Sequence, residues 1–337
     1  MAGEYVLYGH IGSPYSMKMR SILRYRRIPH TFVEDGIALT RVQQEVKVPV
    51  IPVLADPEGR LQNDSTVLIF ELEKRHSDRS ILPERESDAF LAQLIEDLAD
   101  EWLTKSMYFY RWFHPEYRKA TSEAIAFDMF FGGGREKLEG WAETFRHRQA
   151  DRLDLVGCTE ENRPLIERIA EDFLDILESH VVDTPFLFGS RPSLADFGLF
   201  GQLSQFVMDL SIIQPARDRA PYLMRWVHLM HDLSGLQGEW READQPLHPA
   251  VEHLMGLAGR DYLPFLQANA EAFRDGIGEV HHESDGLTYR QAPYKYQVKC
   301  LQNLRSAYAQ LSDRSRKEID PILERTECQR YLSSKRT

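Results

Sequence analysis

Two hydroxyl-bearing side chains near the N-terminus stand where they could act on a bound ligand. Ser13 follows Gly12 and precedes Pro14, and Ser16 stands three residues further on. Serine is a common helix N-cap and proline is favoured at the first helical position, so this run predicts a helix that begins at Pro14. The unpaired N–H groups and partial positive charge of a helix start favour an anion. The pattern could therefore stabilise a thiolate beside Ser13.

The strength of this effect can be bounded from general magnitudes. A hydrogen bond to a charged group contributes about 1.5–3 kcal/mol, and the helix dipole adds about 0.3–1 kcal/mol. At about 1.4 kcal/mol per pKa unit, the two could lower the pKa of a bound thiol by roughly one to three units. An ordinary thiol would then be largely ionised at neutral pH. The alternative is that Ser13 only caps a helix, and the local sequence leaves both readings open.

Two further segments could hold a ligand that resembles an amino acid. Ile51-Pro52 interrupts an apolar run, and a cis peptide bond there would leave the backbone of Ile51 free for a peptide-like ligand. Asp64-Ser65 begins a predicted helix, whose N–H groups could bind a carboxylate while Asp64 binds an ammonium group. Asp64 and Ser65 are also ordinary helix caps. Only the combination with residues 13–16 points to a ligand.

The elements that must position these residues alternate between strand and helix. Apolar periodicity and turn residues predict strands at 5–8, 31–33, 50–54 and 60–62, helices at 14–25 and 65–76, and a weakly helical stretch at 41–45. We expect the first three strands to form a parallel βαβ unit. The Pro57-Glu58-Gly59 turn would then add an antiparallel edge strand.

Beyond residue 80 the pattern becomes helical. Apolar residues recur at helical spacing as far as residue 240, and Ser193-Leu194-Ala195-Asp196 predicts a capping box at one helix start. The last 90 residues look mostly helical, and we predict that the polar run His281-His282-Glu283 is a solvated loop and not a metal site. The predicted domains are 1–78, 85–244 and an extension at 245–337.

The combined pattern resembles the cytosolic glutathione S-transferases over about residues 1–240. The resemblance rests on Ser13-Pro14-Tyr15-Ser16, Val50-Ile51-Pro52-Val53-Leu54, Asp64-Ser65-Thr66, Ser193-Leu194-Ala195-Asp196 and Pro221-Tyr222-Leu223-Met224-Arg225-Trp226. It implies an α/β thioredoxin-like N-terminal domain followed by an all-α domain. Related redox proteins carry cysteines where Ser13 and Ser16 stand, so this chain should not exchange disulfides there.

The resemblance also implies a function and a set of site residues. Glutathione would bind the first domain, and its thiolate would be transferred to an electrophilic small molecule. The implied activating group is the hydroxyl of Ser13, as in serine-type members, with Tyr8 as the alternative. The implied glutathione-binding residues are Ser13, Ile51, Pro52, Asp64 and Ser65, with Ile51 at the cysteinyl backbone and Asp64 and Ser65 at the γ-glutamyl end.

An aromatic cluster near the end of the first long helix could form the co-substrate pocket. Its residues, with one from the N-terminal helix, are Tyr15, Tyr108, Trp112 and Phe113. Ordinary core packing is the alternative for this cluster. The resemblance further implies a homodimer. Two other function classes stay open: a glutathione-binding scaffold with little turnover, and a glutathione-dependent lyase or isomerase.

Composition narrows the partners and the compartment. The 337 residues carry 52 acidic and 41 basic side chains, a net charge of −11, which disfavours nucleic acids and anionic membranes as partners. The 3 cysteines form no CxxC motif, which argues against a zinc ribbon or a disulfide scaffold and fits a reducing compartment. No run of 18 apolar residues and no signal peptide is found. We therefore expect a cytoplasmic protein without a metal.

Overall fold

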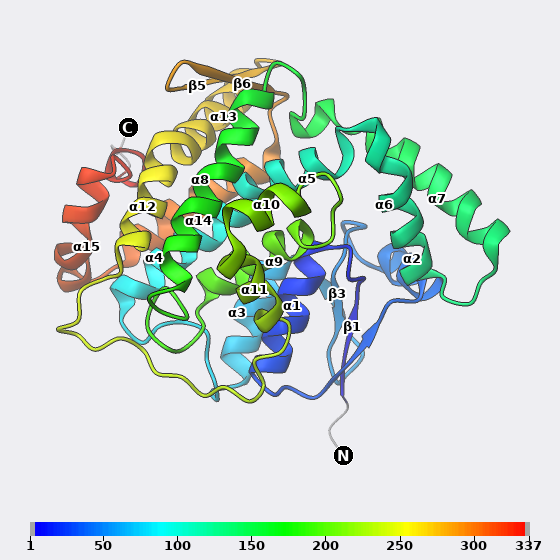
Figure 1. The fold of residues 1–337 in the computed structure, drawn as a ribbon. Helices are drawn as coiled ribbons and strands as arrows, with labels where there is room; N and C mark the ends of the chain where they lie inside the picture. Colours follow the sequence, from blue (N-terminus) through cyan, green and yellow to red (C-terminus); the bar gives the residue numbers. More distant parts are fainter. Residues whose placement is uncertain (1–3, 334–337) are drawn as a thin grey trace.

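The N-terminal part of the chain folds around a mixed four-stranded sheet (Figure 1). The computed structural model describes residues 4–333. The elements of this part are β1 (Tyr5–Tyr8), α1 (Pro14–Tyr25), β2 (His30–Val33), α2 (Gly36–Glu45), β3 (Val53–Ala55), β4 (Leu61–Asn63) and α3 (Ser65–Arg75). The strand order is β2-β1-β3-β4. The predicted helix at Pro14 and the predicted cap at Asp64 are both present.

The direction of the third strand differs from the prediction. β1 and β2 are parallel, but β3 runs antiparallel to both β1 and β4. The register gives the reason: Tyr8 pairs with Val33, the last residue of β2, and with Val53, the first residue of β3. The chain therefore leaves β2 and enters β3 at the same end of the sheet. The loop that leads to Ser13 also leaves β1 at this end.

The middle of the chain is all helix, as predicted (Figure 1). Its elements are α4 (Glu86–Leu98), the π-helical turn η1 (Ala99–Leu103), α5 (Thr104–Trp112), α6 (Pro115–Met129), α7 (Arg135–Ala150), the 3₁₀ turn η2 (Asp154–Val156), α8 (Arg163–Val181), α9 (Leu194–Phe206), α10 (Ile213–Arg219) and α11 (Pro221–Met230). The predicted capping box is present at the start of α9, where Ser193 and Asp196 bond reciprocally. Helix α9 is buried along its length and packs against α1 and α4.

The C-terminal extension adds helices and one hairpin. Its elements are α12 (Pro249–Leu257), the π-helical turn η3 (Ala258–Tyr262), α13 (Leu263–Asp275), β5 (Val280–Ser284), β6 (Leu287–Gln291), α14 (Lys295–Gln310), α15 (Asp313–Arg325) and α16 (Gln329–Leu332). The prediction of a loop at 281–283 is wrong, because these residues belong to β5. Burial alternates along β5, and the ring of His282 packs edge-on against Trp102 at 6.0 Å.

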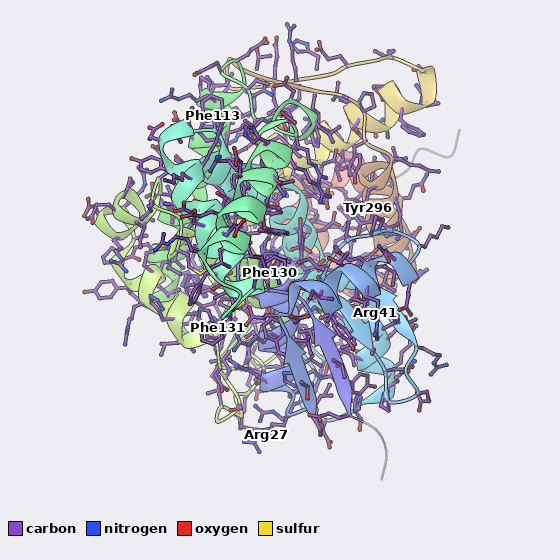
Figure 2. All side chains as sticks on the ribbon, turned by 90° about the vertical axis from the view of Figure 1, so that its right-hand side faces the viewer. Arg27, Arg41, Phe113, Phe130, Phe131 and Tyr296 are labelled. Atoms are coloured by element: carbon purple, nitrogen blue, oxygen red, sulfur yellow. The ribbon has the colours of Figure 1, made fainter. Side chains whose placement is uncertain are left out.

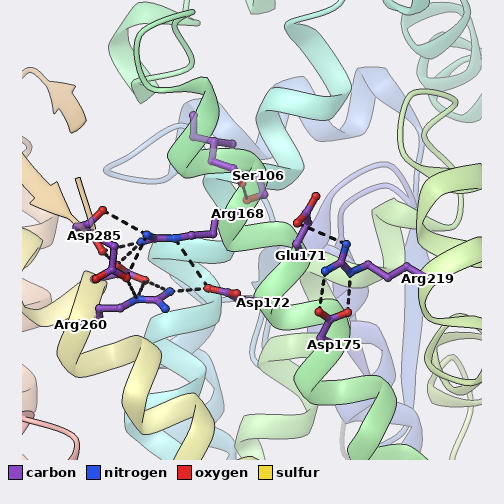
Figure 3. Close-up of polar contacts among 11 residues, drawn as sticks. Ser106, Arg168, Glu171, Asp172, Asp175, Arg219, Arg260 and Asp285 are labelled. Carbon is purple, nitrogen blue, oxygen red and sulfur yellow. Dashed lines mark hydrogen bonds and ion pairs between the residues drawn. The ribbon is translucent and has the colours of Figure 1, made fainter. Parts of the chain in front are cut away.

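A network of ion pairs fixes the extension to the helical part (Figure 3). Arg168 on α8 pairs with Asp261 at 2.8 Å and with Asp285, in the turn of the hairpin, at 3.3 Å. Arg260, in the turn η3 of the extension, pairs in turn with Asp172 on α8. Asp261 is almost fully buried, so these pairs are only partly screened by solvent. The extension therefore packs as a fixed part of the fold. Within residues 4–333, no helix is long and apolar enough to cross a membrane.

Candidate functional site

A cavity of about 710 Å³ opens where the sheet, the helical part and the extension meet. This volume lies in the range typical of small-molecule sites. Among the predicted site residues, those that line the cavity are Ser13, Tyr15, Ile51, Pro52, Asp64, Ser65, Tyr108 and Trp112. The folded chain thus brings the three short segments around Ser13, Ile51 and Asp64 to one cavity, together with Tyr108 and Trp112 from α5.

Ser13 lies at the N-terminus of α1, with only a small part of its surface exposed. The backbone N–H of Ser16 donates to its Oγ at 3.3 Å, and its own N–H donates to the carbonyl of His10 at 3.0 Å. No residue within 4–333 accepts a hydrogen bond from the Ser13 hydroxyl. That hydrogen can therefore point into the cavity, where the helix dipole also favours a negative charge.

The second segment approaches the same place from β3. The Ile51–Pro52 peptide bond is cis, as predicted. β3 begins only at Val53, so Ile51 and Pro52 lie outside the sheet, next to the cavity. The antiparallel direction of β3 puts these two residues at the end of the sheet from which the Ser13 loop departs.

The third segment is the start of α3. Asp64 caps this helix and accepts a long hydrogen bond from the N–H of Val67 at 3.4 Å. The hydroxyl of Tyr296, from the extension, donates to the two carboxylate oxygens of Asp64 at 3.3 and 3.2 Å, and Lys299 Nζ lies 3.5 Å from Oδ2. Figure 2 shows Tyr296 above the N-terminal part that carries the labelled Arg41. The extension thus covers a residue of the first domain 232 positions away.

Two predicted residues lie outside the cavity lining. Tyr8 is half-buried on β1 and is not among the lining residues, whereas Ser13 is. Phe113, predicted for the co-substrate pocket, instead stacks on Phe109 with ring centroids 4.3 Å apart and meets His114 edge-on. Figure 2 places Phe113 far from Tyr296. Phe113 is the first residue after α5, and its side chain packs against neighbouring aromatic rings.

Models of known protein families match both the N-terminal sheet domain and part of the helical domain. The N-terminal domain of the glutathione S-transferases matches residues 7–80, and the C-terminal domain of the same family matches residues 159–228. The chain belongs to the glutathione S-transferase family. Its fold is the predicted one: a thioredoxin-like sheet domain followed by a helical domain. No curated protein matches the chain.

Several solved structures resemble this member of the family, among them two described as glutathione S-transferases and one described as a β-etherase. One from Methylobacterium radiotolerans, in complex with glutathione sulfonate, is 19% identical, covers 73% of this chain and 99% of its own, and has a TM-score of 0.42. A rice enzyme in complex with glutathione is 17% identical, with coverages of 70% and 92% and a TM-score of 0.44. The β-etherase LigF from a Sphingobium strain is 16% identical, with coverages of 75% and 98% and a TM-score of 0.46.

Beside Ser13, this glutathione S-transferase places two groups that the sequence analysis missed. His10 is buried and lines the cavity, and burial, with help from the charge of Arg111, lowers its pKa to about 3. The imidazole is therefore neutral at physiological pH. Arg111 is also buried; it pairs with Asp209 at 2.9 Å and donates to the carbonyl of Gly12 at 2.6 Å. Arg111 thus ties the loop before Ser13 to the helical part.

One wall of the cavity is unexpectedly acidic. Asp97, Asp100 and Glu101 line it where α4 passes into η1. Burial raises the pKa of Asp97 to about 7, and burial likewise raises the pKa of Asp100 and of Glu101. Tyr262 donates to Asp97 at 2.6 Å, and the fully buried Lys18 pairs with Asp100. A run of charged residues at helical spacing was visible in the sequence, but nothing there indicated that they would be buried.

The extension completes this wall through a chain of hydrogen bonds. Lys105 donates to Gln291 at 2.7 Å, Gln291 donates to Gln297 at 3.0 Å, and Gln297 donates to Glu101 at 3.3 Å. Burial lowers the pKa of Lys105, whose ammonium lies 4.9 Å from the centre of the Tyr289 ring. Both glutamines line the cavity. The extension is therefore part of the cavity and not an appendage.

Another part of the cavity lining is apolar and aromatic. Trp112 meets Phe145 edge-on at 5.7 Å, and Phe145 stacks on Trp141 at 4.5 Å. The last two residues belong to α7, which with α6 forms a hairpin that Figure 1 shows standing beside α2. Phe130, labelled in Figure 2, packs on Gly36 at the start of α2, where an added Cβ would lie 2.5 Å from the ring. A side chain at position 36 would therefore require the Phe130 ring to shift.

No metal centre is evident in the part of the chain that the structure describes. Residues 4–333 contain no group of three His, Cys, Asp or Glu side chains that could hold a metal ion. The three cysteines are buried and unpaired as disulfides, and burial raises the pKa of the Cys158 thiol to about 12. None of them lines the cavity.

Proposed function

We propose that this chain is a glutathione transferase that acts through Ser13. Glutathione occupies the sheet side of the cavity with its sulfur beside Ser13, its cysteinyl backbone beside Ile51 and Pro52, and its γ-glutamyl end at Asp64 and Ser65. The hydroxyl of Ser13 donates to the thiolate, and the thiolate attacks an electrophilic small molecule held by the aromatic wall. The protein supplies position and electrostatics, while glutathione supplies the nucleophile.

One observation carries this proposal. A single cavity is lined by the N-termini of α1 and α3, each capped by a side chain suited to one part of glutathione, and by an aromatic group that includes Trp112, Trp141 and Phe145. Helix N-termini bind anions through unpaired N–H groups, which suits a thiolate at α1 and a carboxylate at α3. Ser13 is favoured over Tyr8 as the activating hydroxyl because only Ser13 lines the cavity.

The test is glutathione binding followed by turnover. The chain should bind immobilised glutathione, and with glutathione it should convert a generic aryl halide into the thioether with release of halide. Binding without turnover over a broad panel of electrophiles would support the scaffold reading instead. The homodimer and the cytoplasmic location stay predictions, and a mass near 39 kDa by light scattering at low micromolar concentration would contradict the dimer.

Replacing Asp64 with alanine should weaken glutathione binding by more than about tenfold. The ammonium group of glutathione loses a charged partner, and such hydrogen bonds contribute about 1.5–3 kcal/mol. Isothermal titration calorimetry measures the change directly. Asp64→Asn is the matched variant, because asparagine caps a helix as well as aspartate but carries no charge. If Asp64→Asn binds glutathione like the wild type, the ammonium group does not bind at Asp64.

A further inference from the structure

One face of α7 lines the cavity from Trp141 to the end of the helix. The residues of this face are Trp141, Thr144, Phe145, Arg148, Gln149 and Arg152, the last one just beyond the helix. Their spacing of three and four residues is that of a single helical face. The first half of the face is aromatic and the second half is basic. A ligand that lies along α7 therefore meets aromatic rings at one end and guanidinium groups at the other.

The two arginines of this face are free to bind a ligand. Within residues 4–333, neither Arg148 nor Arg152 lies within ion-pair distance of a carboxylate. Both side chains are exposed, and both line the cavity. By contrast, Arg135 at the start of the same helix pairs with Glu139 at 3.1 Å. A guanidinium group matches a carboxylate in geometry and can bind it through two hydrogen bonds.

A pair of hydrogen bonds fixes the part of α7 that carries the two arginines. The Tyr108 hydroxyl donates to the carbonyl and the side chain of Gln149, at 2.9 and 2.8 Å, which fixes this part of α7 against α5. Burial raises the pKa of Tyr108, and the positive charges of Arg152 and Arg148 oppose the shift, as expected for guanidinium groups that lie near its ring. The acidic residues Asp97, Asp100 and Glu101 line the same cavity.

We infer that the electrophilic co-substrate of this protein is an aromatic carboxylate, with its ring against Trp112, Trp141 and Phe145 and its carboxylate bound by Arg148 and Arg152. This inference rests on the proposed transferase function. In the reaction, the sulfur of glutathione forms a bond to the ring carbon that bears the leaving group. The bond to the leaving group breaks, the leaving group departs with the electron pair, and the thiol proton passes to solvent.

The first experiment compares a charged and an uncharged electrophile. With glutathione, 4-chloro-3-nitrobenzoate and its methyl ester undergo the same displacement of chloride. Because a carboxylate para to the leaving group activates the ring less than an ester does, each kcat/KM is divided by the rate constant of the uncatalysed reaction with glutathione. We expect this normalised value to be about three- to tenfold higher for the acid, the range of two partly solvated charge pairs. In the double variant R148A/R152A the ratio of acid to ester should fall toward one, and R148K/R152K should recover part of it. Raising the salt concentration should reduce the preference of the wild type.

Arg146→Ala is the matched control, because Arg146 lies on α7 but does not line the cavity. It should leave the acid-to-ester ratio unchanged. If Arg146→Ala lowers the ratio as much as the double variant does, the preference arises from net charge and the assignment is overturned. A wild type whose normalised kcat/KM is higher for the ester, or equal for the two electrophiles, overturns it as well.

A binding measurement separates this inference from the proposed function. Nitrobenzoates quench tryptophan fluorescence when they bind close to an indole ring, and Trp112 and Trp141 both line the cavity. Quenching by 3-nitrobenzoate that exceeds quenching by nitrobenzene, and that is lost in R148A/R152A, supports the ligand class even if no conjugation occurs. Conjugation of neutral aryl halides without any such binding supports the transferase and rejects the aromatic carboxylate.

Discussion

Replacing Ser13 with alanine should raise the pKa of the thiol of bound glutathione and slow conjugation at neutral pH by about tenfold or more. The hydroxyl of Ser13 has a free hydrogen at the start of α1, and its loss removes a donor from the thiolate. Each unit of pKa corresponds to about 1.4 kcal/mol, so the loss of one weak charged hydrogen bond suffices for a factor of ten. Titration of the thiolate absorbance in the ultraviolet measures the pKa, and a stopped-flow assay measures the rate.

Three variants separate this role from helix capping. Ser13→Thr keeps both the hydroxyl and the cap and should retain most of the activity. Ser16→Ala should change the thiol pKa far less, because Ser16 lies further along α1 and does not line the cavity. Ser13→Cys should lose conjugation and gain mixed-disulfide exchange with glutathione. If Ser13→Ala titrates like the wild type while Tyr8→Phe shows the shift, the activating hydroxyl is Tyr8.

Local signals in the sequence predict the elements of this fold but not the direction of every strand. The caps at Ser13, Asp64 and Ser193 and the proline at position 14 place helix starts correctly, because they act through bonds within one turn. An apolar run such as residues 50–54 carries no local signal that sets the direction of its strand in the sheet. Whether β3 runs parallel or antiparallel to β1 depends on where α2 and the following loop return the chain, and that is a property of tertiary packing.

In the candidate site, too, local motifs predict some residues, whereas tertiary packing decides the others. The three segments on the glutathione side were predicted because each carries its own short motif. The partners of Asp64 were not predictable, since Tyr296 and Lys299 belong to an apolar-striped helix more than 230 residues away. On α7 the spacing of Trp141 and Phe145 was visible in the sequence and predicted a helix. Helical periodicity shows that a face is apolar, but it cannot show whether that face covers a core or a cavity.

The buried charges at the junction of the two domains were the least predictable part. Lys18 lies on α1 among residues of mixed type, where long charged side chains ordinarily stay exposed. In the structure its side chain is 0% exposed, and its ammonium lies between Glu96 and Asp100. The small residue Gly201 on α9 allows this approach, since an added Cβ there would lie 3.2 Å from the Cβ of Lys18. The partners come from a helix about 80 residues further along the chain.

Replacing Lys18 with methionine should therefore destabilise the protein by about 3–5 kcal/mol, the cost of leaving buried carboxylates without their cation. Methionine keeps most of the volume, so cavity formation contributes little. Lys18 Nζ lies 2.8 Å from Glu96 and also bonds Asp100, whose pKa burial already raises. The free energy of unfolding in urea at pH 8 measures the loss. Thr66, which also donates to Glu96 at 2.8 Å, is too weak a partner to replace the charge.

The pH dependence of this loss distinguishes charge from packing. A carboxyl group whose pKa is raised in the folded state stabilises the fold when protonated, and this contribution disappears as the pH rises through the raised pKa. Lys18 opposes the rise that burial causes in the pKa of Asp100, so without Lys18 this carboxyl group should protonate more readily. The difference in stability between Lys18→Met and the wild type should therefore shrink from pH 8 to pH 5. The triple variant K18M/E96Q/D100N, which removes all three charges, should recover most of the stability at pH 8. A loss that is the same at both pH values, and is not relieved in the triple variant, would show that Lys18 acts through packing alone.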